Sequence, residues 1–113
     1  PTAVKIKSVT LDKFVEQELV KPEIIKIDVE GAEYQVINGF RDYLEQNAPL
    51  IVMEFLSEKR GNEAHLNAEK LLRSLGYDSY IIDRKGKIEE VKNIADFLES
   101  KDVESDNIVF KKG

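Results

Sequence analysis

Cysteine is absent from the 113-residue sequence. The chain therefore has no disulfide, no thiolate metal site and no cysteine nucleophile, which is compatible with a reducing cytoplasm, the localisation that we expect. Long apolar runs are also missing, since a membrane-spanning helix needs roughly 20 such residues and Glu54 interrupts the longest run, residues 50–55. The first five residues, PTAVK, are no signal peptide and include no initiating methionine. We therefore expect a processed or excised piece of a longer chain.

The sequence also has no excess of basic residues. The net charge is −5, and the charged residues, 35% of the total, alternate in sign along the chain. We therefore expect no nucleic-acid partner and no membrane partner. The hydrophobic fraction of 42% is sufficient for a core. The length predicts one domain over residues 1–113.

Hydrophobic patterning predicts strands that alternate with helices. Residues 24–29 form a β-branched run typical of a buried strand, and the mainly apolar residues 50–55 form a second predicted buried strand. A helix is expected between them, over residues 32–47. Further elements are expected in order along the chain: a strand at 4–9, a helix at 10–19, a helix at 64–75, strands at 77–83 and 88–91, a helix capped by Asn93, and a strand at 107–110. The predicted class is α/β, with a mainly parallel sheet, helices on both faces and an antiparallel C-terminal strand.

Acidic residues gather where the two buried strands end. Asp28 ends the first strand and Glu54 the second, while Glu30 and Glu33 flank Gly31 in the turn to the helix. Ligands of open α/β sheets bind at the carboxyl ends of strands. Such acids could bind the ammonium group of an amino-acid-like cofactor, hold a divalent cation or act as a general base on a hydroxyl. Alternatively, the two acids in the turn only cap the helix.

The segment IKIDVEGAEY, residues 25–34, resembles the central signature of FkbM-family methyltransferases. Four other segments resemble family motifs in the same order: residues 9–14, 36–39, 49–55 and 107–110. The resemblance implies a Rossmann-like methyltransferase fold. It also implies methyl transfer from S-adenosylmethionine to the hydroxyl of a sugar or another small molecule.

The resemblance also suggests roles for the acidic residues. It places Asp28 beside the transferred methyl group, and Asp28 and Gly31 become the predicted cofactor-binding residues. Glu30, Glu33 and Glu54 would line the substrate side, so these three and Asp28 are the catalytic candidates. No metal ligand is predicted.

The sequence departs from the family in its glycines. No two of the six glycines are close enough for the G-x-G-x-x-G turn of a Gly-rich cofactor loop, and no acid at the end of an earlier strand is present to hold a ribose. We therefore expect the C-terminal half of a methyltransferase domain, without its N-terminal cofactor-binding strands. The predicted partners are that missing half, a small hydroxyl substrate and, through an exposed sheet edge, a second copy. Alone, the chain is expected to bind S-adenosylmethionine weakly or not at all and to be inactive.

Two weaker interpretations remain open. Asp28 and Glu30 faintly resemble the aspartate motif of haloacid-dehalogenase-type phosphatases, but Glu30 replaces its second aspartate. In the second interpretation, the chain is a non-enzymatic structural or partner-binding module. His65, the only histidine, lies at a polar helix start and is predicted to be a surface residue; the alternative is a catalytic base that reaches the crevice.

Overall fold

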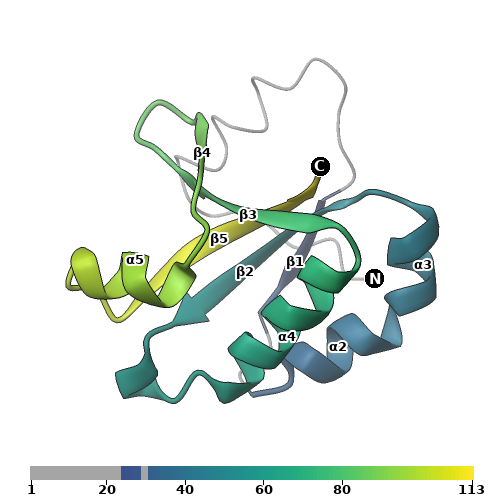
Figure 1. The fold of residues 1–113 in the computed structure, drawn as a ribbon, viewed down its shortest axis with the longest axis horizontal. Coiled ribbons are helices and arrows are strands. Elements are labelled where there is room, and N and C mark those ends of the chain that lie inside the picture. Colours follow the sequence, from purple (N-terminus) through teal and green to yellow (C-terminus); the bar gives the residue numbers. More distant parts are fainter. Residues whose placement is uncertain (1–23, 29–30) are drawn as a thin grey trace.

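The computed structural model describes residues 24–28 and 31–113, in which five strands form one sheet (Figure 1). The strands are β1 (Ile24–Ile27), β2 (Leu50–Leu56), β3 (Tyr77–Ile82), β4 (Ile88–Glu90) and β5 (Ser105–Lys112). The helices are α2 (Glu33–Gly39), α3 (Arg41–Gln46), α4 (Glu63–Ser74) and α5 (Ile94–Ser100), with a short 3-10 turn, η1 (Glu58–Arg60), before α4. In this part of the chain, no helix combines the length and apolar character needed to cross a bilayer.

The strand order is β1-β2-β5-β3-β4, and only β1 and β2 run parallel. The pairs β2–β5, β5–β3 and β3–β4 are antiparallel, so the predicted mainly parallel sheet is wrong. The direction of two strands that follow each other along the chain depends on the length of the connection between them. A parallel pair needs a long crossover, which α2 and α3 supply between β1 and β2, whereas β3 and β4 are joined by a short turn that permits only antiparallel pairing. The predicted antiparallel C-terminal strand is confirmed, and β5 lies inside the sheet rather than at its edge.

The described helices cover one face of the sheet (Figure 1). Their apolar residues join alternate strand residues in one buried cluster: Ile25, Ile27, Ile37, Leu44, Ile51, Met53, Phe55, Ala68, Leu72, Tyr77, Ile94, Leu98, Ile108 and Phe110. A smaller cluster of Leu50, Val52 and Val109 lies on the opposite face. The strand and helix predicted over residues 4–19 lie outside the described residues, so helical cover of both faces stays a prediction.

The helix predicted over residues 32–47 is two helices. α2 ends at Gly39, and Phe40 breaks the run with φ −102° and ψ 9° before α3 begins. Glycine in a helix interior costs about 1 kcal/mol relative to alanine, which favours a break at this point. The break lets Leu44 of α3 and Ile37 of α2 reach the same core.

Two predicted helix boundaries are confirmed. Gly76 follows α4 with φ +94°, the left-handed conformation in which glycine ends helices at no steric cost. The Asn93 side chain caps α5, because its Oδ1 accepts a hydrogen bond from the Asp96 N–H at 3.0 Å. The sequence signals at helix ends are therefore more accurate than the signals for strand direction.

A buried hydrogen bond ties β3 to the start of β2 and gives a first testable prediction. The Tyr77 hydroxyl donates to the Pro49 carbonyl at 2.8 Å, and the residue is only 1% exposed. Tyr77→Phe keeps the ring and removes the donor. We expect the free energy of unfolding, measured by urea denaturation, to fall by about 1 kcal/mol. Tyr34→Phe, on an exposed residue of α2, is the control and should change nothing; equal stability of both variants would contradict the prediction.

Candidate functional site

The carboxyl ends of β1 and β2 lie side by side. Ile27 pairs with Met53, so the next residues along the two parallel strands, Asp28 and Glu54, come level with one another. Both residues are exposed. The strand adjacency on which the predicted crevice depended is therefore confirmed, while the chemical roles of the two acids stay predictions.

Gly31 forms the turn that leads from β1 toward α2. Its φ is +82°, in the left-handed region that glycine adopts at no steric cost. A Cβ built there would meet nothing within 4 Å, which means that the backbone conformation, and not packing, favours glycine. Glu30 lies outside the described residues, and its predicted role is untested.

Glu33, in the first turn of α2, points into the protein. The residue is 3% exposed, and its Oε2 lies 3.3 Å from the Nε2 of His65. Among the described residues, no capping hydrogen bond to the Glu33 carboxylate is found, because its Oε1 has no partner and its Oε2 faces His65, although its place in the first turn of α2 suits the helix dipole. A carboxylate is costly to bury without a partner, and His65 supplies that partner.

The prediction that His65 is a surface residue is wrong. The residue is 3% exposed and lies on the inward face of α4 together with Ala68 and Leu72, three and seven positions further on. These spacings place residues on one side of a helix. Polar residues around the start of the helix hide this periodicity in the sequence, although His65 has the helical spacing of the buried residues Ala68 and Leu72.

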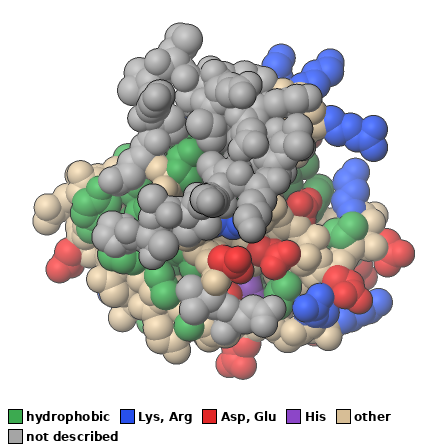
Figure 2. All heavy atoms as spheres, turned by 180° about the vertical axis from the view of Figure 1, so that it is seen from behind, with side chains coloured by type: hydrophobic (Ala, Val, Ile, Leu, Met, Phe, Trp, Pro, Cys, Tyr) green, Lys and Arg blue, Asp and Glu red, His purple; other side chains and the backbone are tan. Residues whose placement is uncertain are grey.

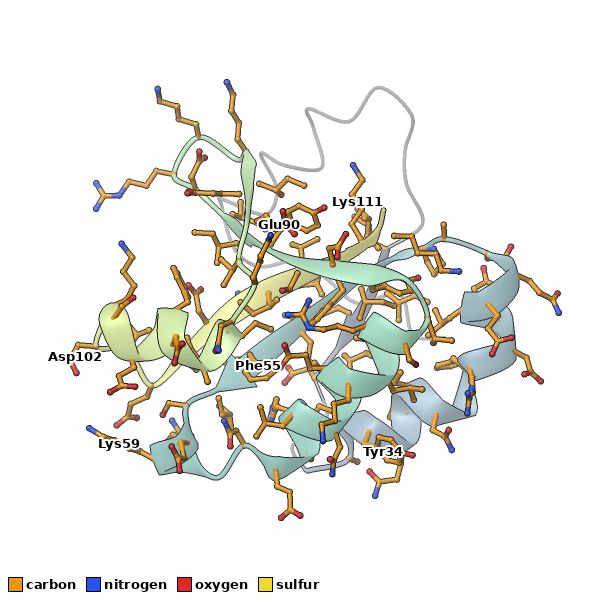
Figure 3. The ribbon with its side chains drawn as sticks, viewed as in Figure 1. Tyr34, Phe55, Lys59, Glu90, Asp102 and Lys111 are labelled. Atoms are coloured by element: carbon orange, nitrogen blue, oxygen red, sulfur yellow. The ribbon has the colours of Figure 1, made fainter. Side chains whose placement is uncertain are left out.

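Phe55 of β2 holds the histidine ring from the sheet side. The two ring centroids are 5.4 Å apart and the planes meet at 61°, an edge-to-face arrangement that aromatic pairs favour. Phe55 is fully buried at the core side of β2, whereas Tyr34, the neighbour of Glu33, projects outward from α2 (Figure 3). Glu33 and Phe55 thus fix the imidazole from two elements.

A pocket of about 320 Å³ opens beside the histidine. It is lined by Gly31, Leu56, Arg60, Gly61, Ala64 and His65. Arg60 is half exposed and pairs with Glu104 at 3.2 Å. The pocket therefore joins the β1 turn, the end of β2, η1 and the start of α4.

Three buried polar atoms in the described residues have no hydrogen-bond partner. They are Glu33 Oε1, Ser57 Oγ and His65 Nδ1. Buried polar atoms are nearly always paired in folded proteins, and each exception calls for an explanation. Two of the three belong to the Glu33–His65 pair, and the third follows the carboxyl end of β2. The unpaired groups therefore coincide with the edge where a ligand is expected.

Further acidic residues lie at this edge of the sheet. The Ser105 hydroxyl donates to Glu54 Oε2 at 3.2 Å. Burial by nearby atoms raises the pKa of Asp106, and the hydrogen bond from the Asn107 N–H lowers it to a smaller extent. Acidic side chains gather beside the histidine in Figure 2. Asp106 was not predicted, because only the strand direction of β5 brings it to this edge.

Metal ligation was one of the open interpretations. Within residues 24–28 and 31–113, no three histidine or carboxylate side chains come together in a way that could hold a metal ion. These residues provide partners for the two other interpretations, which are the binding of an ammonium group and proton transfer.

The fold and the site define an α/β domain with a pocket of mixed polar and apolar lining near the carboxyl ends of two parallel strands, the usual position of ligands in this class. The model of the methyltransferase FkbM domain matches residues 1–79, which is 79 of the 113 residues. The chain belongs to the FkbM methyltransferase domain family. The match ends within β3, so the resemblance of residues 107–110 to a family strand stays a prediction. No curated protein and no solved structure gives a significant match.

Proposed function

We propose that this chain provides the acceptor-binding side of an S-adenosylmethionine-dependent O-methyltransferase that acts on a sugar or another small-molecule hydroxyl. The observation that supports this most directly is the parallel β1–β2 pair, with a glycine turn after β1 and acids at both strand ends. The unit β1–α2–α3–β2 is a strand–helix–strand crossover, the building block of Rossmann-like sheets. Family membership supplies the reaction class.

The described residues fit the amino-acid end of such a cofactor. Asp28 presents an exposed carboxylate after β1, which suits an ammonium group. Gly31 adds a turn with no Cβ, so a ligand can approach the backbone closely. When bound, S-adenosylmethionine supplies an electrophilic methyl group. The residues of this chain would hold its cationic end and position the acceptor hydroxyl.

Asp28→Asn tests the proposal in the full-length gene product. Loss of a charge-assisted hydrogen bond costs about 1.5–3 kcal/mol, so we expect the Kd for S-adenosylmethionine, measured by calorimetry, to rise about 10- to 100-fold. Asp42→Asn, on an exposed residue of α3, is the matched control and should leave the Kd unchanged. Formation of S-adenosylhomocysteine over a panel of sugars and polyols tests the reaction itself.

Two results would count against the proposal. An unchanged Kd in Asp28→Asn would remove this carboxylate from cofactor binding. A full-length protein that neither binds S-adenosylmethionine nor transfers a methyl group would favour the non-enzymatic, partner-binding interpretation. Turnover of a phosphate ester with magnesium would instead favour the phosphatase interpretation.

A further inference from the structure

We infer that His65 is the general base of this site: its Nδ1 takes the proton of the acceptor hydroxyl, and Glu33 is the positioning residue that holds the imidazole. This inference rests on the proposed function and assigns the residue that activates the acceptor.

The geometry selects one nitrogen of the ring. Nε2 faces the Glu33 carboxylate at 3.3 Å, so the proton of a neutral imidazole is stabilised on Nε2. Nδ1 then has a free lone pair and can accept a proton. A base that is oriented by a third group on its other nitrogen is the general pattern of activated hydroxyl nucleophiles.

The unpaired state of Nδ1 is the second observation. The atom is buried and has no hydrogen-bond partner among the described residues. A pair that served only the fold would leave this buried nitrogen without a hydrogen bond, which is unfavourable and brings no compensating gain. When a methyl acceptor binds, its hydroxyl donates a hydrogen bond to Nδ1 and satisfies this atom. Substrate binding and base positioning are therefore coupled at one atom.

The pocket gives the hydroxyl a route to the ring. His65 lines the pocket of about 320 Å³, whose other walls include apolar Leu56 and Ala64 and cationic Arg60. This size and mixed lining suit one small hydroxylated ring better than a polymer surface. Because Nδ1 itself is buried, water is excluded from the proton transfer, and a bound acceptor must displace part of the pocket wall to reach this atom.

The proton balance is simple. The O–H bond of the acceptor breaks, its proton moves to Nδ1, and its electron pair stays on the oxygen, which becomes the nucleophile. The imidazole becomes imidazolium, and the negative charge of Glu33 stabilises this product. The proton leaves to solvent after the methylated product has dissociated.

The tautomer of His65 can be measured without any methyl transfer. His65 is the only histidine of these 113 residues, so 15N labelling of this segment alone identifies its imidazole nitrogen signals in the full-length protein. We expect 15N NMR of the full-length protein to show the proton on Nε2 and a bare Nδ1. A proton on Nδ1 would overturn the inference and leave the proposed function intact.

A matched pair of variants tests the catalytic role. His65→Gln can still donate to Glu33 but has no titratable nitrogen at the Nδ1 position. We expect kcat to fall about 10²- to 10⁴-fold, the usual contribution of a general base, with an unchanged Kd for S-adenosylmethionine. Asn67→Gln, on an exposed residue of the same helix, should retain full kcat.

The outcomes separate the two proposals. An active wild type with an equally active His65→Gln overturns the base and leaves the methyltransferase proposal standing. A wild type without methyl transfer overturns both. If His65→Gln does not fold, the tautomer in the unaltered protein still decides the inference.

Discussion

Glu33→Ala should lower the free energy of unfolding by about 2 kcal/mol, because a buried polar group left without its partner costs about 1–3 kcal/mol. The substitution leaves the His65 Nε2 in the core with no acceptor. Since a domain of this size is stable by about 5–15 kcal/mol, the variant should fold but unfold at clearly lower urea concentration.

Glu45→Ala is a closely matched control. Glu45 also lies on a helix and also pairs with a cationic side chain, Arg41, at 3.4 Å, but both side chains are about half exposed. Exposed pairs of this kind contribute about 0.3–0.5 kcal/mol. The two substitutions therefore remove the same group, one from the core and one from the surface. Equal destabilisation would show that burial of the Glu33–His65 pair has no energetic importance.

Glu33→Gln separates charge from hydrogen bonding. The amide oxygen can still accept the Nε2 proton of His65, so we expect a loss of only about 1 kcal/mol. The same variant should slow methyl transfer, because an amide stabilises imidazolium less than a carboxylate does. A fold that tolerates Gln and a reaction that does not would be consistent with Glu33 as a positioning residue.

The elements around the site were largely predictable from the sequence. The apolar runs marked β1 and β2 to within two residues, and Gly76 and Asn93 marked helix ends. Local patterns carry this information because they reflect the conformation of a few neighbouring residues. The direction of β3 was not predictable in this way, since a buried strand has the same apolar pattern whichever way its neighbours run. The antiparallel direction of β5 was predicted, but its place between β2 and β3 was not.

The Glu33–His65 pair shows a second limit. Each residue has a local signal: Glu33 lies in the turn after β1, and His65 is in register with Ala68 and Leu72. Their contact spans 32 positions and depends on how α2 and α4 pack against the same face of the sheet. Periodicity places a side chain on a face of its own helix, but it does not identify the residue on the neighbouring helix. Tertiary structure alone turns these two polar residues into one site.

Phe55→Ala is expected to lower the free energy of unfolding by about 3–5 kcal/mol, the usual cost of replacing a buried phenylalanine. Phe55 is completely buried between β2 and the helices, and its ring contacts the edge of the His65 ring. The cavity left by the substitution borders the imidazole. We therefore expect a second effect, in which the His65 nitrogen signals broaden or report both tautomers.

Phe110→Ala is the control that separates these two effects. Phe110 is also fully buried in the same core and pairs with Ile51, four residues along β2 from Phe55 and thus about 13 Å away. Its removal should destabilise the fold to a similar extent but leave the His65 tautomer unchanged. Identical nitrogen spectra for the two variants would mean that Phe55 does not hold the imidazole. A change confined to Phe55→Ala would instead show that one side chain both fills the core and orients the proposed base, so that packing and acceptor activation depend on the same contact.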